Sequence, residues 1–231
     1  MTAQTIFDVP PAPCVAITGS DRVFPVRRVF CVGRNYAAHA AEMGNEVDRE
    51  APFYFTKSAR AVIPSGSHIA YPLGTNDCHY EMEFVIAIGA DAFEVSAAEA
   101  LGAVYGYACG IDLTRRDLQG AAKAARRPWD LGKDFENSAI MGAITPAAQF
   151  GAVRDQAIWL DLDGARVQQA VLSDMVWSVP EIIAHLSQFY HLAPGDLIYT
   201  GTPAGVGPVV AGSKITGGVD GLTPIALDID A

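Results

Sequence analysis

Residues 79–89 read HYEMEFVIAIG, an apolar run of aromatic and β-branched residues that also carries two glutamates, Glu81 and Glu83. This composition predicts a β-strand that ends at the glycine. Side chains alternate along a strand, so both carboxylates share one face, which Val85 and Ala87 continue. Two neighbouring acids repel each other, and an apolar continuation does not favour a solvated edge. The fold must therefore leave this acidic pair in water or give it a shared cation.

A third carboxylate follows the next predicted strand. The run AVYGYACGID, residues 103–112, is uncharged until it ends at Asp112, where a buried carboxylate needs a partner. Hard divalent cations such as Mg²⁺ or Mn²⁺ take oxygen ligands, so Glu81, Glu83 and Asp112 form a candidate metal site. Because E-x-E is a common pattern, a strand whose acidic face is simply solvated remains the alternative on spacing alone.

A candidate acid–base pair lies on a short helix predicted from Asn35 to Met43 and closed by Gly44. His39 and Glu42 are three positions apart, so they share a helix face and can hydrogen-bond. A histidine that a carboxylate orients can take a proton from water near neutral pH. An exposed pair that only stabilises the helix is the alternative. We expect this helix and the polar residues 44–50 to close over a substrate as a lid.

Turn and capping signals place the other elements. Asp163-Gly164 predicts the turn of a hairpin over residues 157–171. A basic helix is expected to begin at Thr114 and to end before Pro128. A capping box of Ser178 and Glu181 opens another helix. At helical spacing, that helix is expected to bury Ile182, Ile183, Leu186 and Phe189.

Composition restricts the fold class and the partners. Half of the 231 residues are hydrophobic and 18% are charged, which predicts one compact domain rather than a disordered chain. The predicted strands outnumber the predicted helices, which favours a β-rich, mixed α+β class. The formal net charge of −10 disfavours binding to nucleic acid or to anionic membranes. We find no signal peptide, no apolar segment long enough to span a membrane and no C-x-x-C pair, so we expect a cytoplasmic protein without a zinc site.

Several ordered motifs together resemble the fumarylacetoacetate hydrolase family, and within it the short acylpyruvate and fumarylpyruvate hydrolases. The motifs are CVGRNYAAHAAEMG, PFYFTK, HYEMEFVIAIG, YGYACGIDLTRRDLQ, GKDF and TGTPAGVGP. The resemblance covers residues 29–231 and implies a single catalytic domain there, preceded by a variable extension or hairpin at residues 1–28. It also implies the β-roll of the fumarylacetoacetate hydrolase type, with a few outer helices and a homodimer as the common assembly.

The resemblance assigns roles to particular residues. It implies that Mg²⁺ or Mn²⁺ is bound by Glu81, Glu83 and Asp112. It implies that the catalytic residues are His39, Glu42 and Lys133. It implies that the substrate site is lined by Arg34, Lys57, Gln119 and Thr202.

The resemblance also implies the reaction, which is hydrolytic cleavage of the C–C bond of a 2,4-diketo acid in the catabolism of aromatic compounds. For fumarylpyruvate the products are fumarate and pyruvate. The distal carboxylate of such a substrate needs a cation, for which Arg34, Arg115 and Arg116 are all candidates. The alternatives on the same metal site are oxaloacetate decarboxylation and the isomerisation and decarboxylation of 2-hydroxyhepta-2,4-diene-1,7-dioate. A non-catalytic protein that binds a small carboxylate through its metal is a further alternative.

Overall fold

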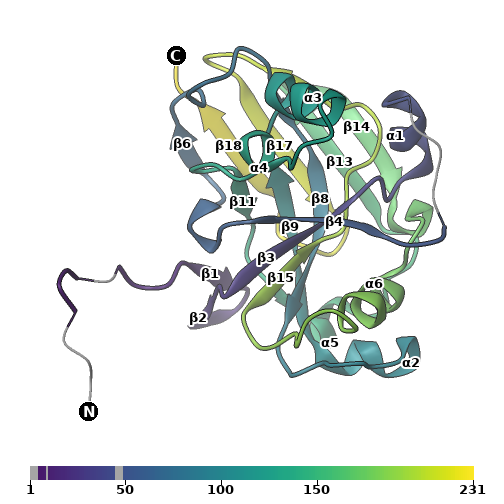
Figure 1. The fold of residues 1–231 in the computed structure, drawn as a ribbon. Helices are drawn as coiled ribbons and strands as arrows, with labels where there is room; N and C mark the ends of the chain where they lie inside the picture. Colours follow the sequence, from purple (N-terminus) through teal and green to yellow (C-terminus); the bar gives the residue numbers. More distant parts are fainter. Residues whose placement is uncertain (1–4, 9, 45–48) are drawn as a thin grey trace.

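The computed structural model describes residues 5–8, 10–44 and 49–231, and a large mixed sheet forms its centre (Figure 1). In these residues the strand order is β4-β3-β15-β8-β9-β11-β5, and β12 pairs with β9. The bounds are β4 Phe53–Lys57, β3 Arg28–Gly33, β15 Asp196–Tyr199, β8 Met82–Ile88, β9 Val104–Asp112, β11 Ala139–Met141, β5 Val62–Pro64 and β12 Thr145–Pro146. The strand predicted over residues 79–89 is divided at Glu81, and its longer part, which includes Glu83, is the central strand β8.

A second sheet has the order β14-β13-β17-β18-β6 in the described residues. Its strands are β14 Ala165–Val171, β13 Ala157–Leu162, β17 Lys214–Val219, β18 Ile225–Ile229 and β6 Ser67–Ile69. The predicted hairpin is confirmed as β13 and β14, which pair antiparallel. Asp163 and Gly164 both have positive φ, at 52° and 83°, as a two-residue hairpin turn of type I′ requires.

Two smaller sheets complete the β structure of the described chain. One contains β10 Thr114–Arg115, β7 Cys78–Tyr80 and β16 Gly207–Val209, with β7 in the middle. The other is the predicted N-terminal hairpin, β1 Cys14–Ile17 and β2 Ser20–Pro25. Its side chains Val15, Ile17 and Phe24 are buried against the large sheet. The division of the chain at residue 29 stays a prediction.

The helices are short and lie at the outside of the sheets (Figure 1). The α-helices are α1 Ala37–Glu42, α2 Ala97–Ala100, α3 Arg116–Ala124, α4 Asp130–Lys133, α5 Ala147–Phe150 and α6 Val179–Leu186. The 3₁₀ turns are η1 Ala59–Ala61, η2 Leu101–Ala103 and η3 Leu172–Asp174. No helix of the described residues has the length and apolar character needed to cross a membrane. The mixed, β-rich fold class with outer helices is confirmed.

Two local predictions were wrong. Phe189 is 68% exposed, because α6 ends at Leu186 and the next residues leave the helical face that the core covers. The basic helix begins at Arg116 rather than Thr114, because Thr114 is taken up in β10, where it pairs with His79. A short strand that extends a sheet thus displaced the cap that local sequence favoured.

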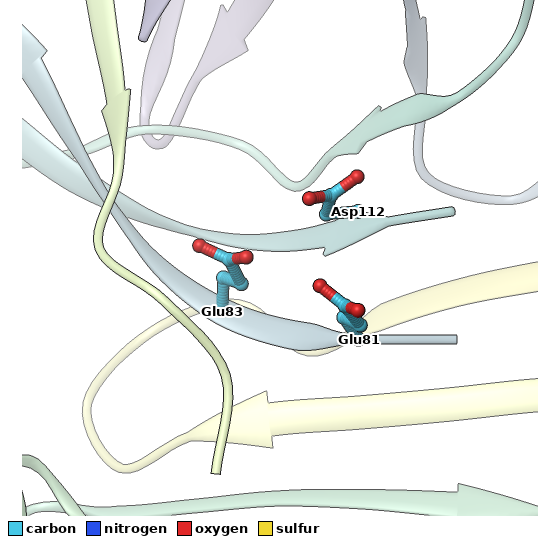
Figure 2. A group of neighbouring side chains, drawn as sticks. All are labelled: Glu81, Glu83 and Asp112. Atoms are coloured by element: carbon cyan, nitrogen blue, oxygen red, sulfur yellow. The ribbon is translucent and has the colours of Figure 1, made fainter. Parts of the chain in front are cut away.

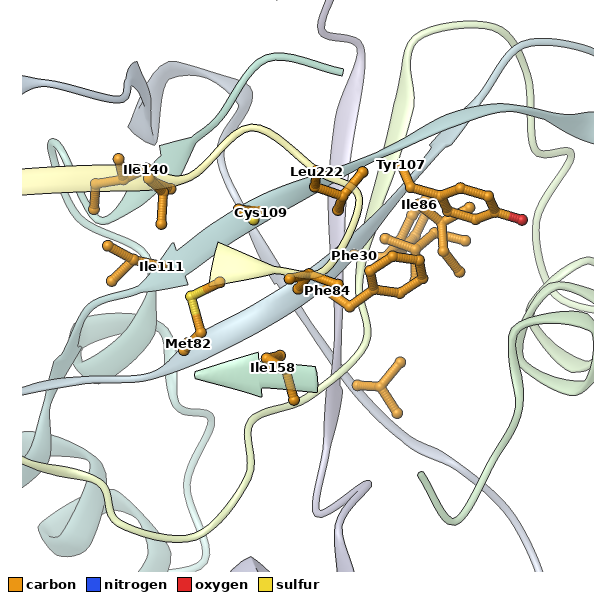
Figure 3. Close-up of a cluster of buried hydrophobic side chains, with 14 of the residues drawn as sticks. Phe30, Met82, Phe84, Ile86, Tyr107, Cys109, Ile111, Ile140, Ile158 and Leu222 are labelled. Carbon is orange, nitrogen blue, oxygen red and sulfur yellow. The ribbon is translucent and has the colours of Figure 1, made fainter. Parts of the chain in front are cut away.

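Hydrophobic clusters cover both faces of β8. Met82, Phe84 and Ile86 pack in the larger cluster, together with Ile158 of the second sheet (Figure 3). On the other face, Val85 and Ala87 pack with residues of β3 and of the N-terminal hairpin. The face that carries the glutamates is consequently buried along the strand, and the interpretation of a solvated acidic edge does not hold.

Candidate active site

The three predicted metal ligands meet where β8 begins. Glu81 stands in the break between β7 and β8, and Glu83 is the second residue of β8. Asp112 ends β9, where its N–H donates to the carbonyl oxygen of Glu81 at 2.9 Å. One oxygen from each carboxylate lies within 4.8 Å of the others, and all three residues are buried (Figure 2). Strand register therefore gathers the acids that spacing alone only suggested.

Two buried lysines hold Asp112. Lys133 Nζ donates to Asp112 Oδ2, Glu81 Oε2 and Thr114 Oγ1, each at 2.7 Å. These three bonds account for all three N–H groups of the ammonium. Lys57 Nζ forms an ion pair with Asp112 Oδ1 at 2.7 Å, and among the described residues this oxygen accepts no hydrogen bond. Asp112 is thus charge-compensated but keeps one oxygen with an unused lone pair.

The two glutamates differ in their surroundings. Burial alone would raise the pKa of Glu81, but the positive charges of Lys133 and Arg116 outweigh it and hold this pKa well below its usual range. Arg116 forms an ion pair with the second carboxylate oxygen of Glu81. For Glu83, burial raises the pKa well above the usual range, and the negative charges of Asp112 and Glu81 add to the effect. Glu83 therefore lacks the positive charge that its ionised form requires.

These residues fit a hard divalent cation. All three donors are carboxylates, which Mg²⁺ and Mn²⁺ prefer, and the cluster contains neither thiol nor imidazole. One carboxylate oxygen of each acid lies within 4.8 Å of the others, and Glu83 lacks compensating positive charge. A cation held by Glu81, Glu83 and Asp112 would supply that charge.

The predicted acid–base pair is formed on α1. His39 Nδ1 and Glu42 Oε2 are 3.2 Å apart, and His39 is buried. The backbone N–H of Gly205 donates to both oxygens of Glu42, at 3.1 and 3.2 Å. The loop after β15 thus fixes the carboxylate that orients the imidazole. Of the expected lid, residues 45–48 lie outside the described part of the chain.

A cleft of about 530 Å³, including the part open to solvent, brings the two glutamates and His39 together, whereas Asp112 and Glu42 do not line it. Its lining includes His39, Glu81, Glu83 and Lys133, and also Arg34, Gln119 and Thr202. Of the predicted substrate contacts, Lys57 is the exception, because it lies beneath the cleft and reaches Asp112 from below the surface. Arg115 lines a different hollow, where its guanidinium stacks on Phe135 at 4.2 Å.

Sequence reasoning missed several supporting groups. Arg116 was one member of a basic run, and its ion pair with Glu81 became visible only in the fold. The N–H of Gly201 donates to Glu83 Oε2 at 2.6 Å, a backbone contact that no side-chain pattern reveals. Asn35, fully buried, bonds the backbone of Trp177 and Thr200 and so ties α1 to β15. The available sequence signal was an asparagine at the predicted start of a helix. Its burial is known from the structure.

Comparisons with known proteins agree with this geometry. The chain is 50% identical over 189 residues to a fumarylpyruvate hydrolase of Ralstonia sp., covering 81% of this chain and 98% of that protein. It is 38% identical over 203 residues to a mitochondrial oxaloacetate tautomerase of Arabidopsis thaliana, covering 88% and 91%. A crystal structure of fumarylpyruvate hydrolase from Pseudomonas aeruginosa, in complex with Mn²⁺ and pyruvate, matches with a TM-score of 0.95 and 46% identity over 98% of this chain and 99% of that one.

The family model of the fumarylacetoacetate (FAA) hydrolase C-terminal region matches residues 28–229. This match spans nearly the whole described fold, including every candidate site residue. The chain therefore belongs to the fumarylacetoacetate hydrolase family.

Proposed function

We propose that this protein is a divalent-metal-dependent hydrolase that cleaves the C–C bond of an acylpyruvate, with fumarylpyruvate as the substrate and fumarate and pyruvate as the products. The observation that carries the proposal is the cleft lined by Glu81, Glu83 and the carboxylate-oriented His39, with Asp112 buried beside the two glutamates. The relative from Ralstonia sp. named fumarylpyruvate hydrolase, at 50% identity, supports the same substrate.

Charge supports a substrate with two carboxylates. The three acids of the candidate metal site are contacted, in the described residues, by three cationic side chains, those of Lys57, Lys133 and Arg116. The fully ionised cluster is therefore neutral, and a bound divalent cation would leave it with two positive charges. Fumarylpyruvate carries two carboxylates, which would restore neutrality. An uncharged ketone would leave the cation's charge without a partner in a partly buried cleft.

Arg34 is the proposed partner of the distal carboxylate. It lines the cleft, whereas Arg115 lies outside it and Arg116 is occupied by Glu81 and Gln119. The Arg34 guanidinium lies over the Phe53 ring at 5.7 Å, and no ion pair joins it to a carboxylate of the described residues. Its backbone has a φ of 59°, uncommon for a residue with a side chain. Strained residues of this kind cluster at ligand sites.

The hydrolytic step is assigned to His39. Glu42 engages Nδ1, which leaves Nε2 to take a proton from a water molecule. The hydroxide oxygen forms a bond with the distal carbonyl carbon of the substrate, and the resulting tetrahedral species collapses by breaking the C–C bond to the pyruvyl CH₂. Fumarate with its new carboxyl group protonated and the enolate of pyruvate result. The enolate receives the proton from His39 at carbon 3, and the new carboxyl group releases its proton to solvent.

The other residues hold the substrate and its charge. When bound, the cation at Glu81, Glu83 and Asp112 supplies Lewis acidity toward the keto acid. Gln119 and Thr202 line the cleft with groups that can donate hydrogen bonds to a developing oxyanion. Lys133 has no N–H group left for the substrate, so its proposed role is to keep Glu81 ionised and to hold both Glu81 and Asp112 in place.

The test follows the loss of the enol ultraviolet absorbance of fumarylpyruvate, with acetylpyruvate and oxaloacetate measured in parallel. Equal amounts of fumarate and pyruvate are expected in the presence of Mg²⁺ or Mn²⁺, and none with EDTA. His39→Ala is expected to lower kcat by about 10²- to 10⁴-fold, the usual contribution of general acid–base catalysis. The matched control is His68→Ala, because His68 is an exposed histidine on β6 that pairs with Asp228 of β18 and does not line the cleft. Metal-independent turnover, or an unchanged kcat for His39→Ala, would contradict the proposal.

Oxaloacetate is the second candidate substrate, because the tautomerase of Arabidopsis thaliana shares 38% of its residues with this chain. Enolisation or decarboxylation of oxaloacetate needs no water attack. An enzyme that consumes only oxaloacetate, with activity that survives in His39→Ala, would therefore indicate this function on the same metal site.

The remaining expectations extend the proposal. We place the enzyme in the cytoplasm as a homodimer, with Mg²⁺ as the physiological metal and fumarylpyruvate supplied by aromatic ring cleavage, as in the gentisate pathway. The net charge of −10 supports a small-molecule substrate over nucleic acid or a membrane surface. Size-exclusion chromatography with light scattering tests the assembly.

A further inference from the structure

The central sheet has a gap beside the metal ligands. β15 pairs with β8 up to Tyr199, which lies opposite Val85, and the next N–H, of Thr200, donates to the Phe84 carbonyl at 3.0 Å. From Gly201 onward the chain turns away. Backbone groups on one edge of a strand alternate with period two, so the N–H of Met82 points to the side that β15 no longer covers. A buried N–H in this position requires another acceptor.

Gln168 fills this gap from the other sheet. Its side-chain Oε1 accepts the N–H of Met82 at 3.0 Å, and its Nε2 donates to Thr202 Oγ1 at 2.9 Å and to the Pro203 carbonyl at 2.8 Å. The residue lies on β14 and is 1% exposed. One buried amide therefore joins the strand that carries the glutamates to the loop that replaces β15.

Both ends of this bridge belong to the walls of the cleft. Met82 lies between Glu81 and Glu83 in the chain, so the position of its backbone determines where the two glutamate side chains leave the strand. Thr202, at the other end of the bridge, lines the cleft. The same loop donates from Gly201 to Glu83, so a shift of the loop moves a hydrogen bond to a candidate metal ligand as well.

The loop also packs on the backbone of β14. Gly205 has a φ of 96°, and a Cβ at this position would lie 2.0 Å from the Val167 carbonyl oxygen. Its N–H donates to Glu42, and its carbonyl accepts from Tyr80 Oη at 3.1 Å. β14 is therefore the surface against which the loop is fixed, and Gln168 is the buried side chain by which β14 also reaches β8.

We propose that Gln168 is a positioning residue, which holds the Glu81–Glu83 backbone and the Thr202–Pro203 segment at a fixed separation and so sets the geometry of the metal ligands. The inference rests on the proposed metal site and goes beyond it, because Gln168 does not itself line the cleft and contacts none of the three carboxylates. Without its amide, Met82 N–H and the Pro203 carbonyl lose their buried partners, and both walls must move to find others.

The test compares Gln168→Met with Gln169→Met. Methionine is similar in length to glutamine but cannot replace its hydrogen bonds. Gln169 is the matched control, because it is the next residue of β14 and is exposed on the opposite face of the strand. The dissociation constant for Mn²⁺ is measured on metal-free protein from the electron paramagnetic resonance signal of free Mn²⁺, and kcat and KM are measured separately. Circular dichroism and a thermal melt establish that each variant is folded.

The Mn²⁺ dissociation constant of Gln168→Met is expected to rise by about 10- to 100-fold, as for other groups that orient metal ligands. Its kcat is expected to fall at saturating Mn²⁺, while Gln169→Met keeps the values of the original protein. A residue that only stabilises the fold would lower the melting temperature and leave the dissociation constant of the folded protein unchanged. That result overturns the proposal.

Gln168→Asn serves if the methionine variant does not fold. It keeps the amide but is one methylene too short to span both walls, so a smaller change in the same direction is expected. Unchanged Mn²⁺ affinity in Gln168→Asn would also overturn the proposal, as would a lack of Mn²⁺ binding by the unmodified protein. Failure to hydrolyse fumarylpyruvate would refute the proposed function alone, because Mn²⁺ binding by the resting protein does not depend on the substrate.

Discussion

Replacing Lys133 with methionine tests the charge balance of the candidate metal site. The Lys133 side chain is 2% exposed, and its ammonium donates hydrogen bonds to two buried carboxylates and one hydroxyl. Methionine fills a similar volume but leaves Glu81 and Asp112 without that charge. Each lost bond to a charged group is worth about 1.5–3 kcal/mol, so the two carboxylate bonds together give about 3–6 kcal/mol. This range agrees with the cost of removing one partner of a buried ion pair, which is about 3–5 kcal/mol.

A divalent cation should offset much of this loss. In EDTA we expect Lys133→Met to lower the free energy of unfolding by about 3–5 kcal/mol. In excess Mg²⁺ the bound cation would again compensate the negative charge of the three carboxylates. A ligand at 100 times its dissociation constant stabilises a protein by about 2.7 kcal/mol. Because the ammonium no longer competes for Glu81 and Asp112, the cation should stabilise the variant more than the original protein.

The assay is urea unfolding followed by circular dichroism, with EDTA and with Mg²⁺. Lys214→Met is the control, because Lys214 is an exposed lysine at the start of β17 and is expected to change stability by less than about 0.5 kcal/mol. A loss below about 1 kcal/mol for Lys133→Met in EDTA would refute the charge-balance reasoning. Equal stabilisation of both proteins by Mg²⁺ would refute the assignment of the metal to these carboxylates.

Three further outcomes are expected. Arg34→Met should raise KM for fumarylpyruvate by about 10-fold or more, the effect of losing a charge-assisted bond, and leave KM for acetylpyruvate nearly unchanged; equal changes would exclude the distal-carboxylate role. At pH 8 a thiol reagent should modify only Cys14 in the native protein, because it is exposed, whereas burial raises the pKa of Cys78 and Cys109 to about 12 and keeps them as thiols; four reactive thiols should appear in guanidinium. Asp196→Asn should lower the free energy of unfolding by about 1–3 kcal/mol in urea, because the buried carboxylate accepts from two partly exposed arginines; an unchanged urea midpoint would show that these ion pairs add no stability.

The metal ligands were predictable because their signal is local. Glu81 and Glu83 share a face through the two-residue period of a strand, which does not depend on the rest of the fold. His39 and Glu42 share a face through the helical period in the same way. Asp112 was recognised only as an acid at the end of an apolar run, and its place beside Glu81 came from the register of β8 and β9. The roles of all these residues stay proposals.

The supporting residues were not predictable, because their partners are distant in sequence. Gln168 reaches Met82 across 86 positions and joins two different sheets. Nothing in the run ARVQQAV distinguishes its first glutamine from its second except the alternation of strand faces, and that pattern does not say which face is buried against a site. Phe189 illustrates the converse: helical spacing favoured its burial, but the helix ended first.

The resting site already uses the oxygens that a metal needs. Lys133 donates to Glu81 and Asp112, so a cation must compete with a buried ammonium that those same carboxylates keep charged. The cluster is neutral when all three acids are ionised, so adding the cation alone leaves two uncompensated positive charges, and this limits the affinity for the cation. A dianionic substrate removes that excess, so each ligand should bind more tightly when the other is present. Linkage makes the effect reciprocal, and metal and substrate are thus expected to assemble the working site together.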